Sequence, residues 1–143
     1  MRDVPRQLEE LAELFEGRTR LVEKLAEQDD PLGSAHDVIR TLSEEEKLEA
    51  LNAHPAIGAR RLSVRSAAEQ GADDEPETLA ELERLNREYE ERFGFRFVVF
   101  VNRRPKSEIV PILRERLERS REEELDTAVE ELVAIAEDRW RRS

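Results

Sequence analysis

The chain has no cysteine, few aromatic residues and no long hydrophobic run. None of its 143 residues is Cys, and 5% are Phe, Trp or Tyr. The lack of cysteine excludes disulfides, thiolate nucleophiles and thiolate-bound metals. Low aromatic content argues against a β-rich core, and no apolar run approaches the ~20 residues of a membrane span. The first residues, MRDVP, lack the apolar centre of a signal peptide, so we expect a cytoplasmic protein.

Charge takes the place of these missing features. Charged residues make up 41% of the chain, apolar residues make up 38%, and the formal net charge is −11. This balance is typical of amphipathic helices whose outer faces are charged, within one domain spanning residues 1–143. The acidic balance disfavours nucleic acids and anionic membranes as partners. It still allows a small anionic substrate, because arginines can gather locally in a pocket.

Apolar residues at helical spacing predict an all-α fold. Capping boxes (Ser or Thr followed three residues later by Glu) at Ser43, Thr78 and Ser120 mark expected helix starts. The most apolar stretch, residues 93–101 (FGFRFVVFV), has no partner strand elsewhere, so we interpret it as buried extended or irregular chain. The prediction is a single-domain multi-helix bundle with one buried extended or irregular segment near residues 94–101. Its helical segments are expected at 8–15, 21–26, 34–42, from 43, 77–92, from 107, and from about 121 to 140.

A candidate site lies in residues 53–70, AHPAIGARRLSVRSAAEQ. His54 is followed by Pro55, which restricts the backbone. In a helix, Ser66, Glu69 and Gln70 would share one face and present a hydroxyl, a carboxylate and an amide. A histidine near that face could complete an acid/base site. The alternative is that Ser66-x-x-Glu69 is one more capping box; the two roles are compatible.

Two other polar residues border predicted apolar faces. Arg139 falls four residues after Ile135 on the inner face of the last helix, where a guanidinium needs a structural or a substrate carboxylate. The alternative is that its charge reaches solvent near the helix end. Asn86 is either a structural hydrogen-bonding residue or a pocket residue. We expect His36 at the surface and no metal site, because the histidines are far apart and cysteine is lacking.

Taken in order, these motifs resemble the OHCU decarboxylase family of urate degradation (OHCU is 2-oxo-4-hydroxy-4-carboxy-5-ureidoimidazoline). The resemblance extends from about residue 14 to residue 139. It rests on AHP at 53–55, SxxEQ at 66–70, LNxxYxxRFGFxF at 85–97, and an isoleucine four residues before the late arginine. Each motif alone is weak, but their order and spacing together are specific.

The resemblance implies an all-helical homodimer that needs no metal and no organic cofactor. It implies decarboxylation of OHCU to S-allantoin, with His54 and Glu69 as the catalytic pair. Substrate contacts are implied for Ser66 and Gln70. The pocket would be completed by Pro55, Phe93, Gly94, Phe95 and Arg139.

The sequence also departs from the family pattern. Arg96 stands where the family has proline, residues 18–20 (RTR) replace a common tryptophan, and the loop after Gln70 lacks a glycine–leucine pair. Two alternatives therefore remain: a decarboxylase of another carboxylated heterocycle, or a non-catalytic helical interaction module. The enzyme predicts that His54, Glu69 and Arg139, with Ser66 and Gln70, surround one cavity.

Overall fold

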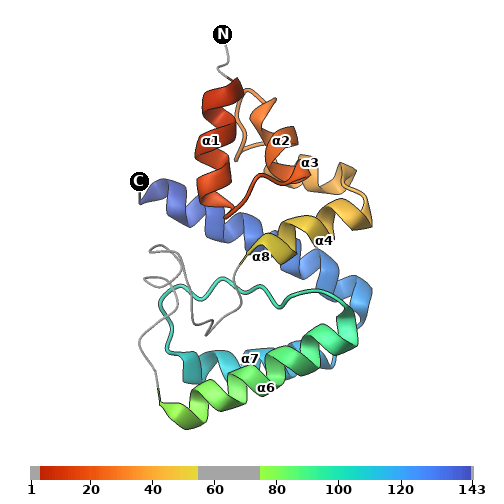
Figure 1. Ribbon diagram of the computed structural model, residues 1–143, viewed down its shortest axis with the longest axis vertical. Coiled ribbons are helices and arrows are strands. Elements are labelled where there is room, and N and C mark those ends of the chain that lie inside the picture. Colours follow the sequence, from red (N-terminus) through yellow and green to blue (C-terminus); the bar gives the residue numbers. More distant parts are fainter. Residues whose placement is uncertain (1–3, 55–74, 143) are drawn as a thin grey trace.

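The computed structural model describes residues 4–54 and 75–142 (Figure 1). Within these ranges the chain is all-α and contains no strand, which confirms the predicted fold class. The helices are α1 (Val4–Leu14), α2 (Arg20–Ala26), α3 (Ala35–Thr41), α4 (Glu44–Ala53), α6 (Pro76–Phe93), α7 (Lys106–Leu117) and α8 (Arg121–Arg141).

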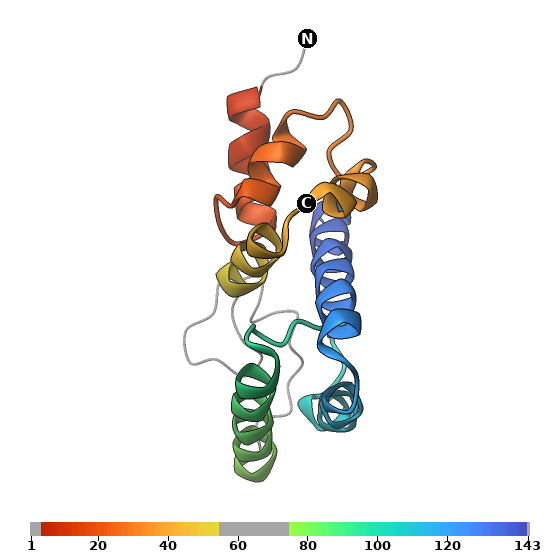
Figure 2. The ribbon, with the colours of Figure 1, turned by 90° about the vertical axis from the view of Figure 1, so that its right-hand side faces the viewer.

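The long helix α8 runs through the middle of the molecule. Helices α1, α3 and α4 contact it on one side, and α2 packs against α1, α3 and α4. Helices α6 and α7 pack against each other at the opposite end (Figures 1 and 2). Between these two groups runs the extended segment, and its apolar side chains belong to the same hydrophobic core as the helices.

Two of the predicted capping boxes are confirmed and one is wrong. Ser43 and Ser120 each cap a helix, with the reciprocal bonds to Glu46 and Glu123. Thr78 does not begin its helix, because α6 starts at Pro76 and Glu75 is the N-cap residue. Proline suits the first helical position, where a backbone N–H has no intrahelical acceptor.

The extended segment 94–101 is buried, as predicted, although it has no strand partner among the described residues. Arginine side chains supply the missing hydrogen bonds to its carbonyls. Arg116 Nη1 donates to Val98 O at 2.7 Å. Arg104 donates to Val101 O at 2.9 Å and to Phe100 O at 2.7 Å. Because buried carbonyls need partners, these arginines allow the chain to cross the core without a sheet.

A buried charge network joins the helices that flank this segment. Glu124 of α8 is fully buried and accepts from Arg116 Nε at 2.7 Å, Arg119 Nη1 at 2.9 Å and Tyr89 Oη at 2.6 Å. Burial, followed by the hydrogen bond to Glu124, raises the pKa of Tyr89. The Arg116 guanidinium lies 4.7 Å from the centre of the Phe97 ring. The network fixes α6, α7 and α8 around the extended segment.

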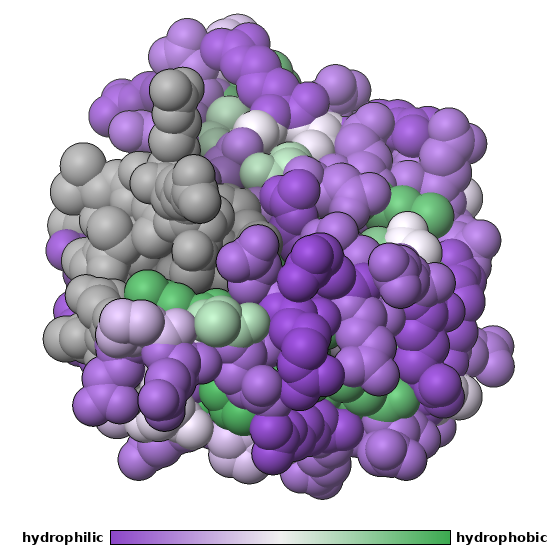
Figure 3. All heavy atoms as spheres, turned by 60° about the horizontal axis from the view of Figure 1, so that its bottom comes forward, coloured by the Kyte–Doolittle hydropathy of each residue, from purple (hydrophilic) through white to green (hydrophobic). Residues whose placement is uncertain are grey.

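The described surface in Figure 3 is mostly hydrophilic, with small hydrophobic spots between charged side chains. Within residues 4–54 and 75–142, no helix has the length and apolar character needed to cross a membrane. Trp140, near the end of α8, is 54% exposed.

Candidate active site

His54 ends helix α4 and turns inward. It is the C-cap residue, with φ −82° and ψ 137°, and its N–H donates to Leu51 O at 3.2 Å. The sequence explains this geometry, because a residue that precedes proline is disfavoured in the helical region. The residue is 7% exposed, so its imidazole lies inside the protein.

The surroundings of His54 keep its imidazole neutral. Burial lowers the pKa of His54 to about 4, and the positive charges of Arg139 and Arg96 act in the same direction. The carboxylate of Glu16 opposes them. Among the described residues, His54 Nδ1 has no hydrogen-bond partner. A neutral imidazole carries a proton on one ring nitrogen only. The other nitrogen is free of a proton and can accept one at neutral pH.

Arg139 points into the core from the last helix. It is 1% exposed, which excludes the solvent-reaching alternative. Its Nη1 donates to Leu14 O at 2.9 Å and to Glu16 Oε1 at 3.2 Å. The structural carboxylate is therefore Glu16. The turn that carries Glu16 also packs against the end of α4, next to His54, so the three groups occupy the same region between α1, α4 and α8.

Glu16 was not found from the sequence. It follows α1 in a left-handed conformation (φ 65°), which is unusual for a residue other than glycine. Its neighbour Gly17 lies against the end of α4: a Cβ there would be 3.2 Å from Ala53 Cβ. The predicted end of the first helix at residue 15 was the only signal. Nothing in the spacing showed that the turn would place Glu16 beside His54.

Arg96 was noted only as a departure from the family pattern, yet it contacts the backbone of His54. Its Nη1 donates to His54 O at 2.5 Å and to Asn52 O at 3.3 Å. Its backbone N–H donates to Asn52 Oδ1 at 3.3 Å. Arg96 therefore joins the extended segment to the last residues of α4.

The predicted pocket residues of the aromatic segment belong to a buried cluster. Phe93 and Phe95 are each 2% exposed and lie 4.6 and 5.8 Å from the ring centre of Tyr89. Gly94 has φ 79°, and its N–H donates to Glu90 O at 2.8 Å, which ends α6. The structure thus gives Phe93 and Phe95 a packing role and gives Gly94 the left-handed helix ending that favours glycine.

The remaining predicted residues have mixed outcomes. Pro55, Ser66, Glu69 and Gln70 lie outside the described residues. Asn86 is buried at 8% exposure on α6. His36 is on the surface, as predicted, with Nδ1 2.8 Å from Glu130 Oε2. Within the described ranges, His, Asp and Glu side chains form no group of three arranged to hold a metal ion.

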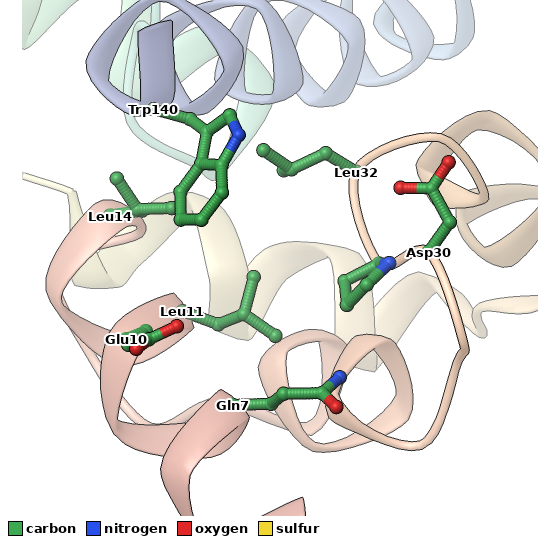
Figure 4. Close-up of a pocket in the computed structure, with 8 residues that line it drawn as sticks. Gln7, Glu10, Leu11, Leu14, Asp30, Leu32 and Trp140 are labelled. Atoms are coloured by element: carbon green, nitrogen blue, oxygen red, sulfur yellow. The ribbon is translucent and has the colours of Figure 1, made fainter. Parts of the chain in front are cut away.

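A separate hollow of about 150 Å³ opens between α1, the 27–34 loop and the end of α8 (Figure 4). Its walls are mostly apolar, and its lining includes none of the predicted site residues. It is lined by Gln7, Glu10, Leu11, Leu14, Asp30, Pro31, Leu32 and Trp140. His54, Glu16 and the Arg139 guanidinium form the candidate site elsewhere.

The model of the OHCU decarboxylase family matches residues 3–141. The chain belongs to the OHCU decarboxylase family. The resemblance inferred from the motifs is thereby confirmed, and the family consists of carboxy-lyases.

Relatives of known name agree with this membership. The chain is similar to a 2-oxo-4-hydroxy-4-carboxy-5-ureidoimidazoline decarboxylase of Haloferax volcanii, with 30% identity over 84% of this chain and 74% of the relative. It is also similar to a uric acid degradation bifunctional protein of Bacillus sp. (strain TB-90), with 30% identity over 70% of this chain and 21% of the relative. The chain thus matches about a fifth of that longer protein.

Solved structures share the fold. A crystal structure of an OHCU decarboxylase in the presence of (S)-allantoin has a TM-score of 0.77 and 25% identity, over 91% of this chain and 94% of that chain. An (S)-allantoin synthase has a TM-score of 0.71 at 22% identity, over 96% of this chain and 50% of that chain, which shows the fold alone.

Proposed function

We propose that this chain decarboxylates OHCU to S-allantoin without a cofactor, as a single domain over residues 1–143. The observation that carries the proposal is the buried, neutral His54 beside the Arg139–Glu16 pair, in a chain of the OHCU decarboxylase family. In the same proposal Glu69 is the acid/base partner of His54, and the chain acts as a homodimer. Substrate contacts are proposed for Pro55, Ser66, Gln70, Phe93, Gly94, Phe95 and Arg139.

The reaction breaks a C–C bond first and needs a proton acceptor in the step that follows. When the bond between the ring and the carboxylate breaks, CO2 leaves and the electron pair moves into the adjacent ring C=N. The 4-hydroxyl then loses its proton and becomes a carbonyl. The ring gains one proton on nitrogen and one on carbon, so the hydroxyl proton and one solvent proton balance the reaction.

His54 suits the role of acceptor for the 4-hydroxyl proton. Its pKa of about 4 leaves the imidazole neutral and available to accept a hydrogen bond at neutral pH. Once protonated beside Arg139 and Arg96, the imidazole releases its proton readily, because burial and the same positive charges that lower its pKa favour the neutral form. Delivery of that proton to the ring carbon from one face would give a single enantiomer of allantoin.

The Arg139–Glu16 pair suits a carboxylate that must leave as CO2. A bare guanidinium would bind the substrate carboxylate strongly and lose that interaction as the charge disappears, which would stabilise the ground state. The carboxylate of Glu16, 3.2 Å from Arg139 Nη1, partly neutralises the guanidinium. Arg139 can then orient the substrate carboxylate without holding it too tightly.

The test generates OHCU in situ from urate and follows both the decay of its absorbance and the optical activity of the allantoin. Wild-type protein should accelerate the decay and give S-allantoin. The variants His54→Asn and Glu69→Gln should each lose about 100-fold or more in rate, within the range for removing a general acid or base.

His36→Gln is the matched control, since it changes the other histidine, which lies on the surface. It should keep the wild-type rate. A wild-type protein that leaves the spontaneous decay rate and a racemic product unchanged would refute the proposal. Light scattering of the same sample tests the dimer, for which the expected mass is twice the 16.7 kDa of the chain.

A further inference from the structure

Helix α4 carries His54 at its last turn, where backbone carbonyls have no intrahelical donor. The last carbonyls of a helix require capping groups, water or side chains. Here the donor comes from the extended segment, since Arg96 Nη1 binds both Asn52 O and His54 O. A cation at this end of a helix is also favoured by the helix dipole.

The backbone of Arg96 completes this connection. Its N–H donates to the side-chain oxygen of Asn52 at 3.3 Å, so Arg96 holds α4 through its main chain and through its guanidinium. Its Nε lies 3.7 Å from Glu90 Oε1, so the guanidinium also forms an ion pair with α6. Proline at this position would remove the N–H donor and the guanidinium together.

We propose that Arg96 is a positioning residue for His54, which fixes the end of α4 by holding the carbonyls of Asn52 and His54. This inference rests on the proposed function for its catalytic consequence but not for its structural content. Arg96 touches the main chain of His54 and is not itself a catalytic residue. Its role follows from Nη1, whose two N–H groups donate to the carbonyls of Asn52 and His54 at the same time.

The charge of Arg96 gives the inference a direct physical readout. The charged groups that act on His54 are Arg96 from the extended segment, Arg139 from α8 and Glu16 from the turn after α1. Arg96 lowers the pKa of His54, so removing its positive charge should raise that pKa. A residue that merely filled space would leave the titration of His54 unchanged.

The experiment compares Arg96→Met, Arg96→Lys and the control Arg87→Met in the full chain. Arg87 is exposed on α6, and its change to Met removes the same charge elsewhere. The titration of the His54 ring is followed by NMR and assigned with His54→Asn; the chain has only two histidines. The decay of OHCU gives kcat and KM for each variant.

Arg96→Met should raise the pKa of His54 and lower kcat by about tenfold to 100-fold, with KM changed less than kcat, because misplacement of a reacting group costs rate. Arg96→Lys keeps the charge but replaces the planar guanidinium by a shorter ammonium side chain, so it should restore the titration of His54 and only part of kcat. Arg87→Met should match wild type in both measurements.

An unchanged His54 titration in Arg96→Met overturns the inference. Should the wild-type protein fail to convert OHCU, the proposed function is refuted by that result alone. The NMR comparison of Arg96→Met with Arg87→Met then still decides whether Arg96 acts on His54. Trp140 fluorescence, from the only tryptophan in the chain, verifies that each variant is folded.

Discussion

His54 couples the stability of this protein to pH, and His54→Asn removes that coupling. In the folded protein the pKa of His54 is lowered to about 4, from an unperturbed value of 6.5. The unfolded chain therefore takes up a proton on this residue at a higher pH than the folded chain does. The stabilising contribution is complete above pH 6.5 and is lost as the pH falls toward 4.

The size of the effect follows from the shift. Each pKa unit corresponds to about 1.4 kcal/mol, so protonation of His54 should cost the fold roughly 3 kcal/mol in total. Between pH 7.5 and pH 5.0, where most other groups keep their charge, the linkage relation gives about 2 kcal/mol. His54→Asn should lose that much less stability than wild type over this interval.

Urea denaturation followed by Trp140 fluorescence measures the free energy of unfolding at several values of pH. Carboxylates contribute to the pH dependence of both proteins, so the comparison uses the difference between wild type and variant. His54→Leu is a second non-titrating variant and should show the same reduced slope as His54→Asn. If wild type and both variants lose stability in parallel from pH 7.5 to 5.0, His54 is not a buried neutral imidazole.

Four further substitutions test the buried charge network and the helix ends. Glu124→Leu leaves Arg116 buried without its carboxylate and should lower the free energy of unfolding by about 3–5 kcal/mol in urea denaturation; a loss below about 1 kcal/mol would contradict the buried network. Gly94→Ala should cost about 1–2 kcal/mol through its positive φ alone, since an added Cβ meets no atom within 4 Å; an unchanged Tm would refute the strained ending of α6. Ser120→Ala should cost about 1 kcal/mol and Thr78→Ala much less, because only Ser120 is an N-cap; equal losses on thermal unfolding would contradict that assignment.

The sequence alone determined the helical class, most helix boundaries and the buried extended segment. Local chemistry was enough for these features. Ser43 and Ser120 cap helices through residues three positions away, and apolar spacing marks the inner faces. Thr78 shows the limit of such patterns, because Pro76 and Glu75 began the helix before the capping signal. The inward direction of Arg139 was also predictable, since it shares a helix face with Ile135.

Only the tertiary structure decided what surrounds His54. Glu16, Arg96 and Arg139 are far from it in the sequence, and no spacing rule relates them to it. The packing of Gly17 against Ala53 brings Glu16 to the site, and the extended segment brings Arg96 to the end of α4. A residue's pKa depends on burial and on charges nearby in space, which are set by how distant segments pack. The sequence therefore supplied a candidate imidazole, and the fold made it buried and neutral.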